Sequence, residues 1–296
     1  MINYVFFGSP EFAAIILESL IKTGFIPAAV VCNPDRPVGR KKIVTLPPTK
    51  LVIGNQKIEN GIKVLQPEIL DSEFRTLISK LKPDVFIVAA YAKIIPKEIL
   101  EIPRLGTIGV HPSLLPRHRG ASPIQSAILE GDEVTGVTLY LLDEKMDHGP
   151  IIAGQELKIG NSNSQTLMRE LAELGAKLLA EKLPKFIGGE IKLQVQNEEY
   201  ATYTKKIKTE DAFVNLAALQ AAMQGEPHPL GREKAIEIER KVRALNPEPG
   251  VWTIWNGEKP FDKAQGKRVK ILEAELKEGR LVLKKIQFEG KKPQVL

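Results

Sequence analysis

Three nearly continuous apolar runs constrain the fold of this chain more than any other feature of its sequence. They are INYVFF at residues 2–7, the run at residues 26–31 and DVFIVAA at residues 84–90. Strands without polar alternation belong to sheets that are covered on both faces, as in a parallel sheet flanked by helices. Residues 12–20 place apolar side chains at helical spacing directly after the first run. The amino-terminal region therefore predicts an open α/β sheet.

The turn after the first run argues against a dinucleotide-binding enzyme. GSPEF at residues 8–12 contains one glycine, whereas the dinucleotide fingerprint GxGxxG requires three. A nicotinamide-dependent oxidoreductase is therefore excluded as far as the sequence allows. The turn is either purely structural or a ligand contact, because open α/β sheets bind ligands at the carboxyl ends of their strands.

Local patterns predict the remaining elements. Strands are expected at residues 106–110 and 134–142, and an amphipathic helix over residues 164–187 with Ser164 as its cap. A second helix near residues 235–245 ends where two prolines and a glycine forbid its continuation. Short strands are then expected at residues 251–255, 269–274 and 281–288, so the tail predicts a small β-barrel or meander.

Length and composition are those of a globular protein with two domains. The chain has 296 residues, 43% of them hydrophobic and 26% charged, which excludes the disordered and fibrous classes. The one cysteine, Cys32, lies in an apolar run and is expected in the core rather than as a nucleophile. No cysteine and histidine cluster has zinc-ligand spacing, so we expect no metal. With no basic leader and no stretch of about 18 apolar residues, we expect a cytoplasmic protein without a membrane anchor.

The excess positive charge lies in the carboxyl-terminal third of the chain. Residues 200–296 contain 19 Lys and Arg against 13 Asp and Glu, whereas residues 1–199 contain 23 of each kind. The net charge of +6 therefore belongs entirely to the tail. A surface for a polyanion, with nucleic acid as the first choice, and a solvated basic face without a partner both explain this asymmetry.

Residues 33–50, NPDRPVGRKKIVTLPPTK, form a second basic feature. The basic side chains of this segment are Arg36, Arg40, Lys41, Lys42 and Lys50, against the single acid Asp35. Four prolines and a glycine exclude a helix, so we expect a long loop without secondary structure. Such a loop inside a compact domain is usually functional or disordered. We favour contact with a phosphate backbone over an idle loop, because the segment combines charge with rigidity beside a strand end.

The segment at residues 106–149 carries the candidate chemistry. His111 directly follows an expected strand, and the loop HPSLLPRHRG that it opens is stiffened by Pro112 and Pro116. Asp147 lies just past a second expected strand, TGVTLYLL. A histidine and an acid at such strand ends can meet at the active edge of an α/β sheet, as a paired imidazole and carboxylate require. Taken singly, His111 is equally explained as a buried or surface histidine, and Asp147 as the cap of its own turn.

Six sequence strings resemble one known family, in order and across nearly the whole chain. They are FGSPEFA, PDRPVGR, VAAYAKIIPKEIL, HPSLLPRHRGASPIQ, TGVTLYLLDEKMDHGPI and RKVRALNPEPG. SLLPxxRG followed by TGVTxxxxxxxxDxG resembles the 10-formyltetrahydrofolate-dependent formyltransferase superfamily. Within that superfamily, the basic loop after PDRP and the RALNPxPG string are similar to methionyl-tRNA formyltransferases.

The resemblance implies a fold, an activity and a set of partners. The implied fold is a doubly wound, mostly parallel α/β sheet with a small carboxyl-terminal β-barrel of the OB type, expected to be shortened because the tail is short of strands. The implied domains are a formyltransferase domain at residues 1–188, a linker at 189–204 and a tRNA-binding OB-like domain at 205–296. The implied activity transfers a formyl group from 10-formyltetrahydrofolate to the amino group of methionyl-initiator tRNA, for initiation of translation. We expect a monomer whose partners are tRNA and folate.

The resemblance also implies site residues, wherever positions match. His111 matches the catalytic histidine and Asp147 the catalytic aspartate. The residues assigned to the folate are Ser113, Leu114, Leu115 and Pro116, which match the lining loop, together with Tyr91. The residues that match those expected to grip the acceptor arm are Arg36, Arg40, Lys41 and Lys42. We expect His111 to stabilise the oxyanion and transfer a proton, and Asp147 to orient the imidazole.

One departure from the family concerns position 109. The family's catalytic asparagine stands two residues before the histidine, where this chain has Gly109. That amide is thought to bind the formyl oxygen as it becomes an oxyanion, and loss of one such donor typically costs about 10²–10³ in rate. Either another donor substitutes or the enzyme is slow. On this view, Gly109→Asn would leave the activity equal or raise it.

Two rival functions follow from these observations. A relative that formylates a small amine, such as glycinamide ribonucleotide or an amino sugar, would need neither the basic loop nor the basic tail. A catalytically weak protein that binds tRNA or folate is suggested by Gly109, and it would bind without forming a product. A panel of amine acceptors separates these alternatives.

Overall fold

The computed structural model describes residues 2–39, 42–55, 61–225, 230–255 and 266–296. The chain folds into two compact units. The first comprises residues 1–120, 134–158 and 168–203, and the second comprises residues 121–133, 159–167 and 204–296. The domain limits expected from the resemblance stay predictions.

The first unit contains most of the helices and strands. In chain order they are β1 (Tyr4–Phe7), α1 (Glu11–Lys22), β2 (Ala29–Val31), β3 (Arg36–Val38), β4 (Ile43–Thr45), α2 (Pro48–Asn55), β5 (Lys63–Leu65), α3 (Ser72–Ser79), β6 (Val85–Ala89), α4 (Lys97–Leu100), β7 (Thr107–His111), β8 (Arg119–Gly120), β9 (Val134–Leu141), β10 (Ile151–Lys158), α6 (Ser164–Ile187), η1 (Glu198–Tyr200) and β11 (Tyr203–Thr204). Of these, α6 begins in the second unit and β11 ends in it.

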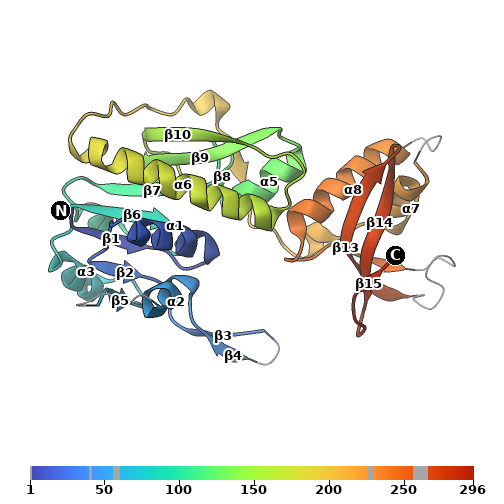
Figure 1. The fold of residues 1–296 in the computed structure, drawn as a ribbon, viewed down its shortest axis with the longest axis horizontal. Coiled ribbons are helices and arrows are strands. Elements are labelled where there is room, and N and C mark those ends of the chain that lie inside the picture. Colours follow the sequence, from blue (N-terminus) through green and yellow to red (C-terminus); the bar gives the residue numbers. More distant parts are fainter. Residues whose placement is uncertain (1, 40–41, 56–60, 226–229, 256–265) are drawn as a thin grey trace. The chain divides into compact units, whose positions relative to one another are not determined.

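Seven strands of the first unit form one mixed, mostly parallel sheet (Figure 1). Their order is β10-β9-β7-β6-β1-β2-β5. All strands from β7 to β5 are parallel, whereas β9 runs antiparallel to β7 and β10 runs antiparallel to β9. The interior strand β1 places Phe7 beside Val31 on one side and Val88 on the other. The parallel α/β sheet predicted from the apolar runs is confirmed.

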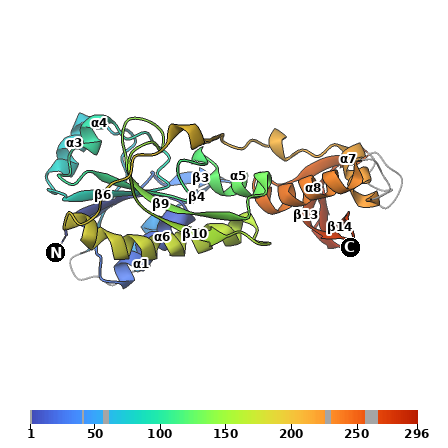
Figure 2. The same ribbon diagram turned by 90° about the horizontal axis from the view of Figure 1, so that it is seen from above.

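Helices cover both faces of this sheet, as its apolar strands require (Figure 2). α1 and α6 lie along one face, and α3 and α4 lie along the other. The residues of β1, from Tyr4 to Phe7, are consequently inaccessible to solvent. α1 buries Phe12, Ile16 and Leu20, which recur at helical spacing.

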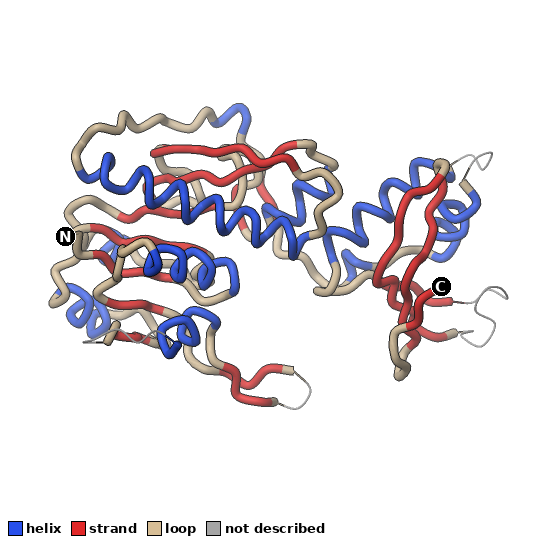
Figure 3. Tube along the Cα trace, viewed as in Figure 1, coloured by secondary structure: helices blue, strands red, loops and turns tan. Residues whose placement is uncertain are grey.

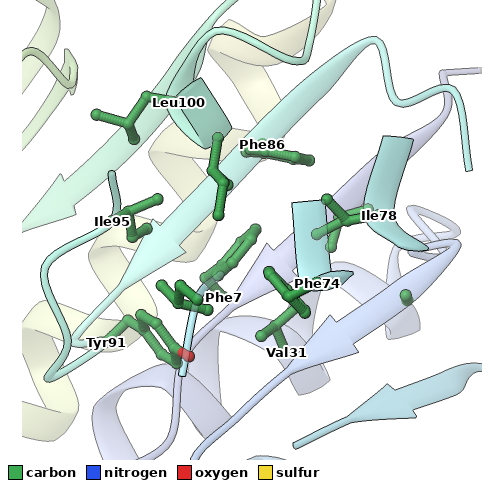
Figure 4. Packing of buried hydrophobic residues seen from close by; sticks show 12 residues of the cluster. Phe7, Val31, Phe74, Ile78, Phe86, Tyr91, Ile95 and Leu100 are labelled. Atoms are coloured by element: carbon green, nitrogen blue, oxygen red, sulfur yellow. The ribbon is translucent and has the colours of Figure 1, made fainter. Parts of the chain in front are cut away.

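A buried apolar cluster joins α3 and α4 to the sheet (Figure 4). Phe7 of β1 and Phe86 of β6 meet edge to face, with their ring centroids 5.0 Å apart. Tyr91 packs against Phe7 in the same way at 5.5 Å. α3 contributes Phe74 and Ile78 to the cluster. Edge-to-face aromatic pairs stabilise a core beyond the burial of their area, so these rings fix the position of the helices on the sheet.

The basic segment at residues 33–50 is more ordered than its prolines suggest. The expectation of a loop without secondary structure is wrong, because β3 and β4 pair as an antiparallel ribbon with Pro37 opposite Val44. All residues of β4 are β-branched, which favours an extended conformation. α2 begins at Pro48, and a proline is tolerated there because the first N–H of a helix has no partner within the helix.

The long helix predicted at residues 164–187 matches α6, but its cap differs. The side chain of Asn163 accepts hydrogen bonds from the backbone N–H groups of Gln165 and Thr166, both at 3.0 Å. Ser164, the expected cap, instead donates to the carbonyl of Asn246 at 3.2 Å. No helix in the described part of the chain, α6 included, has both the length and the apolar character that a bilayer crossing needs.

The second unit carries a four-stranded antiparallel sheet with the order β12-β13-β14-β15. Figure 3 colours the strands of the molecule red and its helices blue. Its elements are α5 (Pro123–Glu130), η2 (Glu210–Ala212), α7 (Leu216–Gln224), α8 (Gly231–Leu245), β12 (Trp252–Trp255), β13 (Lys267–Lys277), β14 (Arg280–Phe288) and β15 (Gln294–Val295). α8 packs against α7, β13 and β14 and buries Ile238, Val242 and Leu245. The small β-domain predicted for the tail is therefore present, and in the described residues it is a four-stranded sheet.

Replacement of Ile78 tests how much the apolar cluster contributes to stability. Ile78 on α3 is fully buried, whereas its neighbour Leu77 is 47% exposed. We expect Ile78→Ala to lower the free energy of unfolding by about 2–5 kcal/mol, because it removes contacts and leaves a cavity. Leu77→Ala is the control and should change it by less than about 1 kcal/mol. Chemical denaturation of both variants makes the comparison, and equal losses would contradict the core position of Ile78.

Candidate active site

His111 and Asp147 come together at the end of the first unit's sheet where β7 finishes. His111 is the last residue of β7, and Asp147 lies in the loop that follows β9, the antiparallel neighbour of β7. Nδ1 of His111 lies 3.6 Å from Oδ2 of Asp147, and the two side chains are 8% and 18% exposed. The structure thus brings together the imidazole and the carboxylate that the sequence singles out, at the distance of an ion pair rather than of a hydrogen bond.

Two donors hold the carboxylate of Asp147. The hydroxyl of Tyr140 donates to Oδ1 at 2.6 Å, and the backbone N–H of Gly120 donates to Oδ2 at 2.7 Å. Asp147 has a φ of +48°, a left-handed conformation that aspartate adopts more readily than most residues. Because each oxygen has its own donor, the carboxylate is fixed with Oδ2 toward His111.

The other ring nitrogen of His111 also faces an oxygen. Nε2 lies 2.9 Å from the backbone carbonyl of His118. A carbonyl can only accept, so Nε2 is the donor in this contact. Nδ1 faces Asp147 on the opposite side of the ring. A protonated His111 therefore has an acceptor for each of its N–H groups.

The proline-containing loop after β7 is tied to β9. The hydroxyl of Thr138 donates to the carbonyl of Ser113 at 2.7 Å and accepts from the N–H of Leu115 at 3.0 Å. Ser113 and Leu115 are buried, and the Leu115-Pro116 peptide bond is cis. Leu114 and Pro116 are partly exposed. The loop is thus a wall with an apolar surface beside His111.

A buried arginine anchors the loop that carries Asp147. The side chain of Arg119 is inaccessible to solvent, and its Nη2 donates to Gln196 at 2.8 Å and to Glu198 at 2.7 Å. The hydrogen bonds from Arg119 to Glu198 raise the pKa of the arginine, which stays charged. Gln196 in turn donates to the carbonyls of Asp147 at 2.9 Å and Gly149 at 2.8 Å. The position of Asp147 therefore depends on residues far downstream in the chain.

Tyr140 and Gln196 are site residues that the sequence does not single out, and Arg119 appears only as the arginine of the SLLPxxRG string, without a role. Tyr140 is included only in the strand expected at residues 134–142. The available signal is the alternation along β9, which puts Thr138 and Tyr140 on one face. Gln196 lies in a segment without periodicity, and no local pattern links it to Asp147.

Position 109 is also close to this pair. Gly109 is a buried residue of β7, two positions before His111, and it pairs with Tyr140 of β9 and Val88 of β6. Residues two apart in a strand point to the same face, so position 109 and His111 share a face of the sheet.

Tyr91, assigned to the folate by resemblance, lies in the apolar cluster. It is 9% exposed, and no described residue offers its hydroxyl a hydrogen bond. Burial raises the pKa of Tyr91 to about 12, so the phenol stays neutral. Tyr91 follows shortly after the end of β6, and its ring packs on Phe7.

The basic residues assigned to tRNA divide into described and undescribed positions. Arg36 is exposed and pairs with Glu68 at 2.9 Å. Lys42 is exposed and directly precedes β4. Arg40 and Lys41 lie outside the described residues.

Lys50, the fifth basic residue of the segment, has a structural role. Its Nζ lies 2.7 Å from Oδ2 of Asp35 and 2.8 Å from Oε1 of Gln66. These hydrogen bonds from Lys50, followed by those from Gln66, hold the pKa of Asp35 below its ordinary value. Lys50 therefore stabilises the start of the β3–β4 ribbon through Asp35 and Gln66.

Comparison with known proteins identifies relatives of both units. Residues 2–183 match the formyl transferase family, and residues 232–280 match the formyl transferase carboxyl-terminal domain. A methionyl-tRNA formyltransferase of Chloroflexus aggregans is 41% identical over 256 residues, which are 86% of this chain and 77% of that protein.

Solved structures share the fold. A methionyl-tRNA formyltransferase from Clostridium thermocellum superimposes with a TM-score of 0.58 at 17% identity, covering 97% of this chain and 99% of that one. HypX from Aquifex aeolicus in complex with tetrahydrofolic acid superimposes with a TM-score of 0.61 at 17% identity, covering 99% of this chain and 45% of that one. At these identities the superpositions establish the formyltransferase fold alone.

Thiol labelling tests the assignment of Cys32 to the core. Cys32 is inaccessible to solvent, and this burial raises its pKa. The thiolate is the reactive form, so a buried thiol with a raised pKa should resist iodoacetamide at mildly alkaline pH. We expect labelling of the native protein to be at least about 100-fold slower than labelling in guanidinium. In the control Lys177→Cys, made without Cys32, an exposed position on α6 should react at once. Fast labelling of native Cys32 would contradict its burial.

Proposed function

The chain belongs to the formyl transferase family and, within it, to the methionyl-tRNA formyltransferases, and from that premise we propose that His111 and Asp147 carry its reaction. The activity is the transfer of a formyl group to the amino group of methionyl-tRNA. The observation that carries the proposal is the 3.6 Å between Nδ1 of His111 and Oδ2 of Asp147. This pair lies at the carboxyl end of β7, the edge at which open α/β sheets bind their ligands.

The formyl donor in this proposal is 10-formyltetrahydrofolate, in keeping with the folate donors of the family. The amine nitrogen of methionyl-initiator tRNA forms a bond to the formyl carbon, and the bond between that carbon and N10 of the folate breaks. The amine loses one proton and N10 gains one. The reaction is therefore balanced without a further reactant.

The two side chains divide the work of proton transfer and charge stabilisation. Attack by a neutral amine places negative charge on the formyl oxygen and leaves a proton on the amine to be removed. An imidazole can accept and return a proton near neutral pH, so His111 is suited to the proton transfer. Because both ring nitrogens already face acceptors, a protonated ring would stabilise the oxyanion through its charge rather than through a hydrogen bond. Asp147 orients the ring through Oδ2.

The loop after β7 is the proposed folate wall. Leu114 and Pro116 are partly exposed beside His111, and hydrogen bonds to Thr138 fix the backbone between them. A rigid apolar surface suits the flat ring system of a folate, because little side-chain freedom is lost on binding. Ser113 and Leu115 support this wall from beneath, where they are buried.

The β3–β4 ribbon and the basic tail are the proposed contacts to tRNA. Arg36 and Lys42 are exposed on the ribbon, and Arg40 and Lys41 complete the set by sequence. The basic excess of residues 200–296 adds to them. Phosphate contacts of this kind supply affinity and register rather than sequence recognition.

Substitution of the two catalytic candidates tests their roles. We expect His111→Ala and Asp147→Ala each to lower the turnover of formyl transfer by about 10²–10⁴, because proton transfer loses its positioned acid and base. Folate affinity, measured by titration calorimetry, should change by less than about threefold. Glu144→Ala is the matched control, since Glu144 is exposed in the same loop and should leave turnover unaltered. Normal turnover in either test variant would refute the assignment.

Salt dependence tests the role of the ribbon. We expect Lys42→Ala to raise the KM for tRNA by about 3–10-fold and to reduce the slope of log KM against log salt by about one, because one phosphate contact is lost. The turnover at saturating tRNA should stay within about twofold of the wild type. Lys177→Ala removes an exposed lysine of α6 and serves as the control. An unchanged slope for Lys42→Ala would exclude Lys42 from the tRNA surface.

A further inference from the structure

Gly109 and Tyr140 face each other across the β7–β9 ladder and compete for one volume. A Cβ atom added to Gly109 would lie 2.7 Å from Cζ of Tyr140 and 2.5 Å from Cδ1 of Leu142, closer than real Cβ atoms approach other groups. The contact with Leu142 involves the end of a flexible side chain, which can turn away. The ring of Tyr140 is 5% exposed and tied down through its hydroxyl, so it has no such freedom. The ring of Tyr140 therefore occupies the space that a side chain at position 109 would need.

The ring that fills this space delivers its hydroxyl to Asp147. The Tyr140 hydroxyl donates to Oδ1 of Asp147 at 2.6 Å, a short hydrogen bond of the charge-assisted kind. Burial, and after it the charge of Asp147, raises the pKa of Tyr140 well above its ordinary value. The phenol consequently keeps its proton and remains a donor throughout the physiological range.

We propose that Tyr140 is a positioning residue for Asp147 in formyl transfer, and that glycine at position 109 is the condition for its placement. This inference rests on the proposed roles of His111 and Asp147. Tyr140 donates to Oδ1 and the N–H of Gly120 donates to Oδ2. Together they fix the carboxylate so that Oδ2 faces His111. Without the phenol, the carboxylate has one donor instead of two and can rotate about its Cβ–Cγ bond.

The hydrogen-bonding capacity of the phenol decides between positioning and direct catalysis. A phenol has a single proton to donate, and Tyr140 gives it to Asp147. The same proton cannot also bind the formyl oxygen. Tyr140 therefore acts through Asp147 and through the imidazole beyond it.

The geometry reverses one expectation drawn from the sequence alone. An asparagine at position 109 was expected to preserve or raise activity, because it would restore an amide donor. Its Cβ would instead press on the ring of Tyr140 and force the hydroxyl away from Asp147. Gly109→Asn is therefore expected to lower activity as long as a tyrosine stands at position 140.

The ionisable groups around the carboxylate are few among the described residues. His111 faces it from β7 and Tyr140 from β9. Asp143 and His148, on the same loop, pair with each other at 2.6 Å, and His148 also lies 3.5 Å from Glu198. Asp143 adds a smaller contribution to the raised pKa of Tyr140. Loss of the phenol thus removes a neutral donor and leaves the surrounding charges in place.

Tyr140→Phe, compared with Tyr4→Phe, is the first arm of the test. Both variants lose a buried hydroxyl and keep the ring, but Tyr4 donates to the carbonyl of Phe25 at 2.7 Å, in β1 and away from Asp147. Formyl transfer to methionyl-tRNA is measured from acidic to alkaline pH, and each kcat/KM is divided by the wild-type value. The ionisation of the substrate cancels in this ratio.

For Tyr140→Phe we expect the ratio to be about 0.1 near neutral pH and to fall further as the pH falls. In general, a hydrogen bond donated to a carboxylate stabilises its charged form, and this variant removes one such bond. The ratio for Tyr4→Phe should stay flat with pH. A flat ratio for Tyr140→Phe, or a ratio near one, would overturn the positioning role.

The second arm measures thermal stability and needs no substrate. The variants are Gly109→Ala, Tyr140→Leu and the double variant. We expect Gly109→Ala to lower the melting temperature by about 5 °C in the wild-type background, because it overpacks a buried contact. The loss should be less than half as large beside Leu at position 140, where the ring is gone. Equal losses in both backgrounds would overturn the claim that the two positions share one volume.

The two arms separate this inference from the proposed function. An active wild type with a flat Tyr140→Phe ratio overturns the positioning role and leaves the proposed function standing. A wild type that transfers no formyl group overturns both the proposed function and the positioning role. The stability arm judges the steric pairing of Gly109 with Tyr140 in either case.

Discussion

The antiparallel register between β7 and β9 is the constraint on which the active site depends. It places Gly109 opposite Tyr140 and His111 opposite Thr138. Thr138 ties down the proline-containing loop, and Tyr140 ties down Asp147, so one strand supports both walls of the site. A slip of one residue would turn both side chains to the other face of the sheet and remove both supports together.

The fold follows from the sequence where burial is complete. The runs that became β1, β2 and β6 are apolar throughout, and only a sheet covered on both faces can bury them. β10 has no such pattern, because most of its residues are exposed or half-buried at an edge of the sheet. The β3–β4 ribbon was missed for a related reason: its residues are exposed, and its prolines outweigh a short β-branched stretch in any local pattern.

The site follows from the sequence only in part. His111 and Asp147 could be found because each stands just past a recognisable strand and belongs to a titratable type. The pairing of Gly109 with Tyr140 could not be found, since it depends on the relative register of two strands that are separated by a loop and a helix. Gln196 was missed, and Arg119 was quoted without a role, because the hydrogen bonds that define their roles join distant segments. Local patterns identify reactive groups more readily than the groups that hold them.

The anchoring of the Asp147 loop by Gln196 bears on the order in which the protein matures on the ribosome. Synthesis proceeds from the amino terminus, so β1, β6, β7 and β9 emerge from the exit tunnel well before the stretch that supplies Gln196 and Glu198. Until that stretch docks, the hydrogen bonds from Gln196 to the carbonyls of Asp147 and Gly149, and those from Arg119 to Glu198, cannot form. The full set of hydrogen bonds around Asp147 therefore requires the connection after α6 to fold back onto strands that are made earlier.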